Sequence, residues 1–363
     1  MAKASIRPLE PRDMGDIAEL MQTRPELTSR EADLRTQQFE WIAFKNPFAR
    51  DEPTYFVAEE GGKVFAHLGR MPLDFATRGK KRRGYFAHDL YVHPEFRSRS
   101  GLGFTVTMGF YKAIEQASAQ SFCCFVWTSP LNLQMQRRRK YHELPGYRWV
   151  KLLDVETKIL PRVKSPLVAS ALSTVANRLS AVADEVVVRA MRPDVEVEPI
   201  TRFDGETDAL CDRVLPKLET TVIRSSAYLN WKYADRADHR MTVFAARRKG
   251  ELTGAIVVRL GQRLRPDDGF IADILADPDD NKTIGALYHR AVSHARANGI
   301  PRIQCIVTDD RFTKVLQPFL FLRREDAPTL LGNLGACEDE GRLKDAGAWF
   351  LTYGDSDGFM LGD

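Results

Sequence analysis

A loop near residue 100 holds the residues whose types and spacing are best suited to chemistry. A strand-like run ends at Val92, and the small-residue loop that follows carries Arg97 and Arg99 before a helix-like run opens with Gly101-Leu102-Gly103. The first N–H groups of a helix lack partners and, with the positive end of the helix dipole, bind phosphate. Glycines let the backbone approach an anion, and arginines add charge-assisted contacts. The loop therefore predicts a site for a phosphate-bearing ligand.

This segment, VHPEFRSRSGLGF at residues 92–104, resembles motif A of the GNAT superfamily of acyltransferases, whose usual form is V-x-P-x-[YF]-R-x-[KR]-G-x-G. The likeness departs after Arg99, because Ser100 stands at the usual first glycine and the glycines come one residue late. The resemblance implies an acyl-CoA co-substrate, acetyl-CoA or a longer ester. The implied contacts are Tyr91, Val92, Arg97, Ser98, Arg99, Ser100, Gly101, Leu102, Gly103 and Phe104. An ordinary strand-to-helix loop with solvated arginines is the alternative.

The likeness covers about the first 150 residues. Residues 54–68 resemble the family's central hairpin, and residues 122–147 resemble its motif B, where Asn132 starts a helix and joins the implied coenzyme contacts. In such enzymes acyl-CoA lies between two splayed strands, which here would end at Val92 and Thr128. The splay leaves strand backbone groups free to pair with the pantetheine amides.

Acyl transfer to an amine needs a base for the amine and a donor for the oxyanion. Asp89 is the candidate base, with His88 and Glu59 as rivals. A hydrogen-bonding role at the strand edge is the alternative for Asp89, and its counterpart in the second half of the chain, described below, strengthens that interpretation. The N–H groups near Tyr91 and Val92 are the candidates for the oxyanion.

The leaving thiolate also needs an acid. Tyr141 resembles the family's tyrosine on the motif B helix and is the candidate acid, although its offset is shifted and a packing role is equally open. The neighbouring basic run at 137–140 is interpreted as a solvated helix face, with a contact to the 3′-phosphate of CoA or to an acidic acceptor as the alternative. The basic run at 80–83 is interpreted as a solvated hairpin tip.

The second half of the chain repeats the first. Three positions recur after 184 residues: Asp89, Pro94 and Gly101 correspond to Asp273, Pro278 and Gly285. The second copy of the loop carries three aspartates, at positions 277, 279 and 280, and lacks the arginines. Acidic groups at a helix N-terminus satisfy the dipole themselves and repel a pyrophosphate. A second CoA site is therefore not expected, and this half would complete the acceptor pocket or stabilise the fold.

The sequence thus predicts a mixed α/β fold of two tandem GNAT-like domains. We expect a catalytic domain at 1–158, an amphipathic helical connector at 159–194 and a degenerate second domain at 195–363. Apolar residues recur along the connector at steps of three and four, namely Leu172, Val175, Leu179, Val182 and Val186. This pattern predicts one long helix that packs on both halves, or that lines a groove for a long acyl chain or a partner.

Composition and charge narrow the functional class of the protein further. A net charge of +4 over 363 residues gives no case for nucleic-acid binding. Five cysteines without a CxxC pair predict neither a disulfide framework nor a metal site. The N-terminal run has no apolar signal core, and no run of apolar residues is long enough to span a membrane, so we expect a cytoplasmic protein without a membrane span.

These features together predict an acyl-CoA-dependent N-acyltransferase, most simply an acetyltransferase, that transfers directly to a small-molecule or peptide amine in a ternary complex. Two alternatives stay open: a non-catalytic acyl-CoA-binding or scaffold module, and a long-chain acyltransferase acting on a peptide or lipid-precursor amine. A homodimer is also open.

Overall fold

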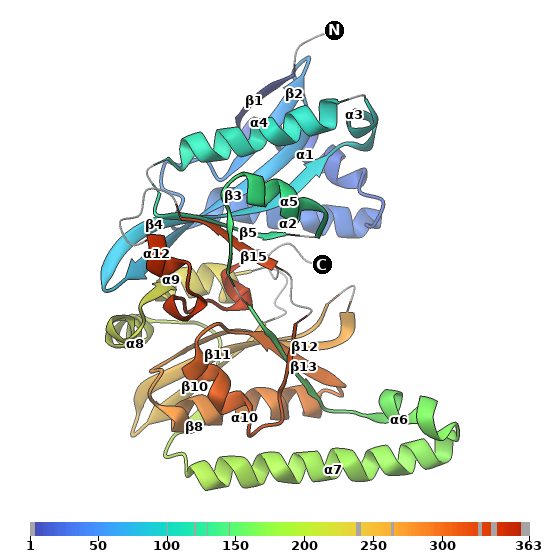
Figure 1. Ribbon diagram of the computed structural model, residues 1–363, viewed down its shortest axis with the longest axis vertical. Coiled ribbons are helices and arrows are strands. Elements are labelled where there is room, and N and C mark those ends of the chain that lie inside the picture. Colours follow the sequence, from blue (N-terminus) through green and yellow to red (C-terminus); the bar gives the residue numbers. More distant parts are fainter. Residues whose placement is uncertain are drawn as a thin grey trace.

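The computed structural model describes residues 4–99, 101–119, 121–128, 130–144, 146–236, 241–262, 265–325, 329–334 and 340–356. It has two mixed β-sheets, one above the other along the long axis, with helices on their faces (Figure 1). The predicted mixed α/β fold with two similar halves is confirmed.

The first sheet has the strand order β1-β2-β3-β4-β5-β15-β6, in which β15 (Thr329–Asn333) comes from the second half of the chain. Its strands from the first half are β1 (Ser5–Pro8), β2 (Tyr55–Glu60), β3 (Lys63–Thr77), β4 (Lys80–Val92), β5 (Cys123–Thr128) and β6 (His142–Leu144). The Gly61-Gly62 turn joins β2 and β3 into the predicted antiparallel hairpin, and β4 runs parallel to β5. Glycine suits this turn because both residues have positive φ.

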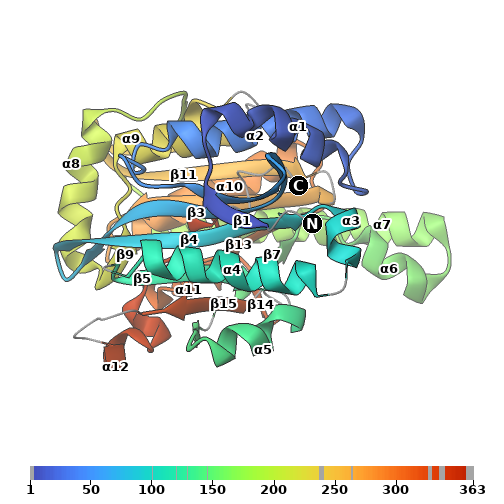
Figure 2. The same ribbon diagram turned by 90° about the horizontal axis from the view of Figure 1, so that it is seen from above.

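Helices cover both faces of this sheet. Helices α1 (Met14–Gln22) and α2 (Ser29–Lys45) lie on one face and α4 (Leu102–Ala117) lies on the other, as Figure 2 shows from above. Alternate residues of a strand point to opposite faces, so β2 feeds two cores. Val57 packs in the core that includes Ile17 of α1, whereas Phe56 packs in the core that includes Phe110 of α4. Each of these helices thus packs its apolar side against one of the two cores.

The second half repeats this arrangement. Its strands are β8 (Glu196–Ile200), β10 (Met241–Arg248), β11 (Glu251–Gln262), β12 (Arg265–Ala276), β13 (Arg302–Ile306) and β14 (Leu322–Arg324). Its helices include α8 (Gly205–Val214), α10 (Asn281–Ala297) and α11 (Asp310–Leu316). The order β10-β11-β12-α10-β13 matches β2-β3-β4-α4-β5, and β12 is parallel to β13 as β4 is to β5.

The two halves exchange strands. Strand β7 (Arg148–Leu152), from the first half, lies between β13 and β14 in the second sheet, and β15 (Thr329–Asn333), from the second half, lies between β5 and β6 in the first. Strand β9 (Thr220–Val222) also pairs with β3. The expected division at 158 and 195 did not anticipate this exchange, because strand partners so far apart in sequence leave no local pattern.

The predicted long helix is α7 (Pro166–Met191), and a shorter helix, α6 (Glu156–Val163), precedes it and begins before the expected connector at 159–194. Asp184 of α7 is buried and binds the equally buried ammonium of Lys151 in β7 at 3.0 Å. Lys151 also donates to the carbonyl of Phe319 at 2.7 Å. A buried ammonium is stable only when it is paired and hydrogen-bonded, so this contact fixes α7 against the second sheet.

The segment 348–356 fills the space beside β12 in the second half. Strands β12 and β13 pair only from Asp268 to Ile271 of β12, and the segment then bridges Val307 through Thr352. At Gly354, a Cβ atom would collide with the carbonyl oxygen of Ala272 in β12. The backbone of this segment therefore occupies the gap that opens where the two strands part.

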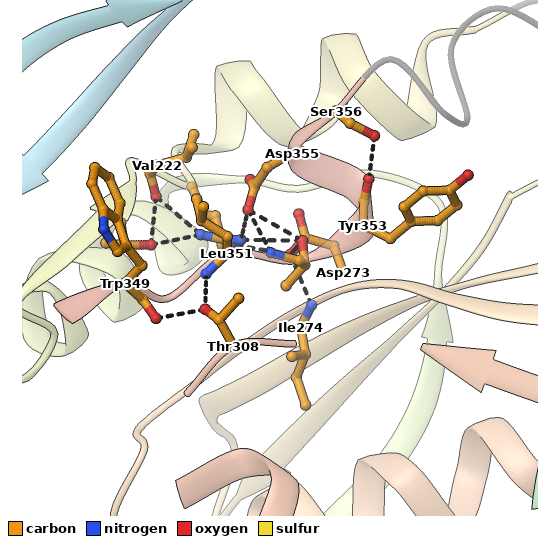
Figure 3. A network of polar contacts seen from close by, with 12 residues as sticks. Val222, Asp273, Ile274, Thr308, Trp349, Leu351, Tyr353, Asp355 and Ser356 are labelled. Carbon is orange, nitrogen blue, oxygen red and sulfur yellow. Dashed lines mark hydrogen bonds and ion pairs between the residues drawn. The ribbon is translucent and has the colours of Figure 1, made fainter. Parts of the chain in front are cut away.

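A buried ion network anchors that segment (Figure 3). The guanidinium of Arg224 donates to Asp273 of β12 at 2.8 Å and to Asp355 of the segment at 2.7 Å. All three side chains are at most 2% exposed. Burial raises the pKa of Asp355, and the Arg224 charge opposes that rise. The arginine thus compensates two carboxylates that would otherwise be buried unpaired.

Arg224→Ala should therefore destabilise the fold. Removing one partner of a buried ion network leaves uncompensated charge and costs about 3–5 kcal/mol. Urea denaturation followed by circular dichroism measures the change. Arg213→Ala is the control, since Arg213 is 47% exposed and its ion pair with Glu251 lies at the surface; its cost should stay below about 1 kcal/mol. Equal stability of the Arg224 variant and the wild type would contradict the anchoring role.

Candidate functional site

Strands β4 and β5 part at the site that the sequence indicates. They pair only over Gly84–Ala87 of β4 and Cys123–Val126 of β5. Beyond that point β5 continues to pair with β15, while β4 continues to Val92 with β3 as its partner. Within the described part of the chain, the edge of β4 from His88 to Val92 therefore has no strand beside it on the β5 side. The predicted splay is confirmed, and its open backbone groups can pair with an extended ligand.

A β-bulge lies at the start of this open edge. His67 of β3 faces Tyr91, whereas Gly69 faces His88, so β4 carries one extra residue between them. Asp89 adopts the left-handed conformation there, with φ 51°. A bulge bends its strand and redirects side chains, and aspartate tolerates positive φ better than most residues. The bulge turns the Asp89 carboxylate toward the helices α1 and α2.

Two arginines hold the Asp89 carboxylate. Its Oδ1 accepts hydrogen bonds from Arg24 at 2.8 Å and from Arg35 at 2.9 Å, and the side chain is 2% exposed. Burial alone would raise the pKa of Asp89, but the charges of Arg35 and Arg24 outweigh it and hold the pKa well below the usual range. Such a carboxylate accepts a proton poorly. Its role as base stays a prediction, and these contacts favour positioning.

The two rivals to Asp89 are also placed by the structure. His88 is buried, and its ring fills the space that a Cβ atom of Gly69 would take. Glu59 lies on β2, which β3 separates from β4, and it pairs with Arg7 at 2.7 Å. The hydrogen bond from Arg7 lowers the pKa of Glu59. Neither side chain is better suited than Asp89 to take a proton at the open edge.

The N-terminus of α4 lies immediately after this edge. Gly101 precedes the helix with φ 71°, and the amide of Leu102 donates to the carbonyl of Arg99 at 3.1 Å. The amides of Gly101, Gly103 and Phe104 find no acceptor among the described residues. No acidic residue occupies the first turn of α4. Amides at the positive end of a 16-residue helix that have no acceptor among the described residues make a candidate anion site.

The equivalent end of α10 is closed by its own side chain. Asp280 accepts a hydrogen bond from the amide of Thr283 at 3.1 Å and pairs with Arg248 at 2.9 Å. The carboxylate therefore satisfies the helix end that an anion would otherwise use. This contact and the segment 348–356 support the expectation that the second half has no CoA site.

The loop between β4 and α4 is ordered by its own contacts. Residues Pro94–Ser98 form a short helix, α3, and the hydroxyl of Ser98 donates to the carbonyl of Glu95 at 2.8 Å. Arg97 donates to the carbonyl of Val92 at 3.0 Å, and Arg99 pairs with Glu60 at 2.7 Å. Both arginines are thus held by the protein, so the amides are the groups left for an anion. Ser100 lies outside the described residues.

The motif B candidates are placed differently from the sequence expectation. Helix α5 (Pro130–Arg138) starts near Asn132, whose side chain lies outside the described part of the structure. Tyr141 lies three residues beyond the end of α5 rather than on it, and is 4% exposed. Burial raises its pKa well above the usual value, and its phenol contacts Cys124 in the paired part of β5. These contacts favour packing; a role as acid stays a prediction.

Two residues at the site were not singled out from the sequence. Arg24 follows α1 and Arg35 lies in α2, and both reach Asp89. The Arg24 guanidinium also stacks on the Tyr91 ring at 4.3 Å, and the Tyr91 hydroxyl donates to the carbonyl of Thr23 at 3.0 Å. The segment between α1 and α2 is thereby fixed over the end of β4. Isolated arginines on a polar helix give no sequence signal for such a role.

Comparisons with known proteins agree with this geometry. Residues 15–138 match the model of the Acetyltransferase (GNAT) family. The structure is similar to a GCN5-related N-acetyltransferase from Kribbella flavida, with a TM-score of 0.60 and 12% identity over 92% of this chain and 72% of that one. A counterpart from Anabaena variabilis gives 0.59 and 11% over 92% and 73%. A comparison with curated protein sequences finds no match.

A further similar structure is the N-myristoyltransferase of Saccharomyces cerevisiae with bound myristoyl-CoA, with a TM-score of 0.53 and 12% identity over 92% of this chain and 82% of that one. At such identities these structures show a shared fold. The chain is a tandem protein of the GNAT fold. Residues 15–138 form a GNAT acetyltransferase domain, and the protein is an acyltransferase, in the general class of acyl-CoA N-acyltransferases.

None of the described helices combines the length and the apolar character needed to cross a membrane. No group of three or more His, Cys, Asp or Glu side chains among the described residues is arranged to hold a metal ion.

Gly101→Asp should weaken acyl-CoA binding while the fold is kept. Aspartate and asparagine both tolerate the left-handed conformation of Gly101, but only aspartate places a negative charge on the free amides of α4. We expect the Kd for CoA, measured by calorimetry, to rise at least tenfold. Gly101→Asn is the matched control and should change it much less. Equal effects of the two substitutions would show that charge at this helix end is irrelevant to binding.

Asp89→Asn tests whether the carboxylate acts as a base or as a positioning group. Folding lowers the pKa of Asp89, so its charge stabilises the protein above about pH 4, the usual range of a free aspartate, and this contribution fades as the pH falls. The variant should be less stable by about 3 kcal/mol or more near neutral pH, and the difference should shrink in acid.

The pH profile of kcat/KM separates the two roles of Asp89. A positioning residue lowers kcat/KM at every pH and leaves the apparent pKa of the acid limb in place. If Asp89 is instead the base, its replacement removes the acid limb. Loss of the acid limb in an Asp89→Asn protein that still binds CoA would contradict the positioning role.

Proposed function

We propose that this protein moves an acyl group from a CoA thioester directly to an amine in a ternary complex. The observation that carries the proposal is the meeting of an open strand edge, at His88–Val92, with the uncapped N-terminus of α4. The strand edge offers backbone groups to an extended chain of amides, and the helix N-terminus offers amides to a diphosphate. Acyl-CoA contains both groups, since its pantetheine amides are joined to a diphosphate.

The donor would lie along the first half. Its pyrophosphate would accept hydrogen bonds from the amides of Gly101, Gly103 and Phe104. Its pantetheine would run along the open edge of β4 toward the bulge at Asp89. The thioester carbonyl would then lie near the backbone N–H groups of Tyr91 and Val92, which are the proposed oxyanion donors.

The chemical step transfers one acyl group and one proton. The amine nitrogen bonds to the thioester carbon, the carbon–sulfur bond breaks, and the proton lost by nitrogen reaches the leaving sulfur through solvent or a side chain. Asp89 and Tyr141 are the candidates to carry that proton. The Asp89 carboxylate also holds Arg24 and Arg35, so we propose that its larger contribution is to fix the α1–α2 segment over the end of β4.

The acceptor would approach from the α1–α2 side of β4. Arg24 and Arg35 are matched there by two carboxylates, because Asp89 binds both arginines and Glu26 lies 3.8 Å from Arg24, so their charges alone select no acceptor. A small-molecule or peptide amine would suit this side. The coenzyme-bound myristoyl chain of the yeast neighbour makes longer acyl groups worth testing alongside acetyl.

Turnover tests the proposal directly. Thiol release should be measured with acetyl-, octanoyl- and myristoyl-CoA over a panel of amino acids, amino sugars and peptides. We expect amine-dependent release with at least one pair, and a drop of at least tenfold in kcat/KM in Gly101→Asp but not in Gly101→Asn. Tight CoA binding without turnover over the whole panel would favour a non-catalytic acyl-CoA-binding module instead.

A further inference from the structure

Helix α7 exposes a continuous apolar stripe. Six aliphatic side chains along it are about half or more exposed: Val168 at 47%, Leu172 at 49%, Val175 at 58%, Leu179 at 65%, Val182 at 58% and Val186 at 59%. The opposite face, with Ser173 and Asp184, is buried against the protein. The helix lies at the outer edge of the second half (Figures 1 and 2). An apolar stripe this long on an outer helix marks an interaction surface.

The spacing of the stripe identifies the kind of partner. Its members follow one another at alternating steps of four and three residues from Val168 to Val186. That is the a and d spacing of two helices packed side by side. A helix that lies in a lipid surface has instead a polar face rich in lysine and arginine. Helix α7 carries Arg178 and Arg189 against Asp184 and Glu185, so it has no net charge.

The residues beside the stripe select the partner. On one border, small residues recur every seven positions at Ala176, Ala183 and Ala190, which lets a second helix approach closely. On the other border stand Arg178 and Glu185, seven residues apart and of opposite charge. If α7 packs antiparallel against a second α7, Arg178 of each copy faces Glu185 of the other. The same register places Leu179 of one copy against Val182 of the other.

We propose that α7 is a dimerisation helix, and that its partner is α7 of a second copy of this chain in antiparallel orientation. A helix of 26 residues is about 39 Å long, and two such helices side by side bury an area that reaches the range of specific dimers, about 1,200 Å² or more. The charges of Arg178 and Glu185 are self-complementary only in this two-fold arrangement, as an isologous interface requires. Glu185 is half exposed, so its carboxylate stays accessible while one of its oxygens lies 3.0 Å from His289.

Oligomeric state tests this proposal on the full-length protein. Analytical ultracentrifugation of the wild type at tens of micromolar should give a dimer, and Leu179→Glu should give a monomer with unchanged circular dichroism. Thr174→Glu is the matched control, because it adds the same charge to an exposed position of α7 outside the stripe and should leave the dimer intact. A monomeric wild type, or a Leu179→Glu variant that stays dimeric, would overturn the proposal.

A charge exchange tests the orientation. Arg178→Glu should weaken the dimer at least tenfold, because it places two pairs of glutamates opposite each other, and adding Glu185→Arg should restore it. Failure of the double variant to recover would overturn the antiparallel arrangement. Co-sedimentation with vesicles of phosphatidylcholine and phosphatidylglycerol tests whether the stripe binds a lipid surface instead. A monomer that binds these vesicles through the same stripe would assign α7 to a lipid surface and overturn the dimer.

Discussion

The parting of β4 from β5 after Ala87 is the constraint on which the rest of the site depends. While the two strands pair, their backbone groups satisfy each other and offer nothing to a ligand. Beyond that point β5 pairs with β15, and among the described residues the edge of β4 is open for five residues and leads directly to the N-terminal amides of α4. Every group assigned to the donor lies on this line. The exchanged strand β15 is therefore part of the catalytic half, although it comes from the other end of the chain.

The two halves share the same fold but differ in whether a ligand can reach the parted strands. Each places an aspartate at the same point of the repeat, and each aspartate binds arginine: Asp89 with Arg24 and Arg35, and Asp273 with Arg224. In the first half these ion pairs fix a segment over the end of an open edge. In the second half the segment 348–356 fills the corresponding gap. The shared aspartate thus binds arginine in both halves, and the halves differ in whether a ligand can reach the parted strands.

Local pattern was sufficient for much of this account. The helix-start glycines, the Gly-Gly hairpin turn and the apolar period of α7 each act over a few residues, so the sequence alone predicted the hairpin, the loop and the long helix. The splay of the two strands was expected only from the resemblance to the GNAT family. The exchange of β7 and β15 depends on pairing between distant segments and left no local trace. The ion pairs of Asp89 were missed for the same reason, because Arg24 and Arg35 meet the carboxylate only after α1 and α2 have packed. The shift of Tyr141 off α5 reflects a helix end that no breaker residue marks.

A crystal structure of the protein soaked with CoA tests the central claim most directly. The account predicts one coenzyme per chain, with its diphosphate against the amides of residues 101–104 and its pantetheine along the open edge of β4. The second half should stay closed by the segment 348–356. Diphosphate density at the N-terminus of α10, or between the halves with α4 left bare, would contradict it.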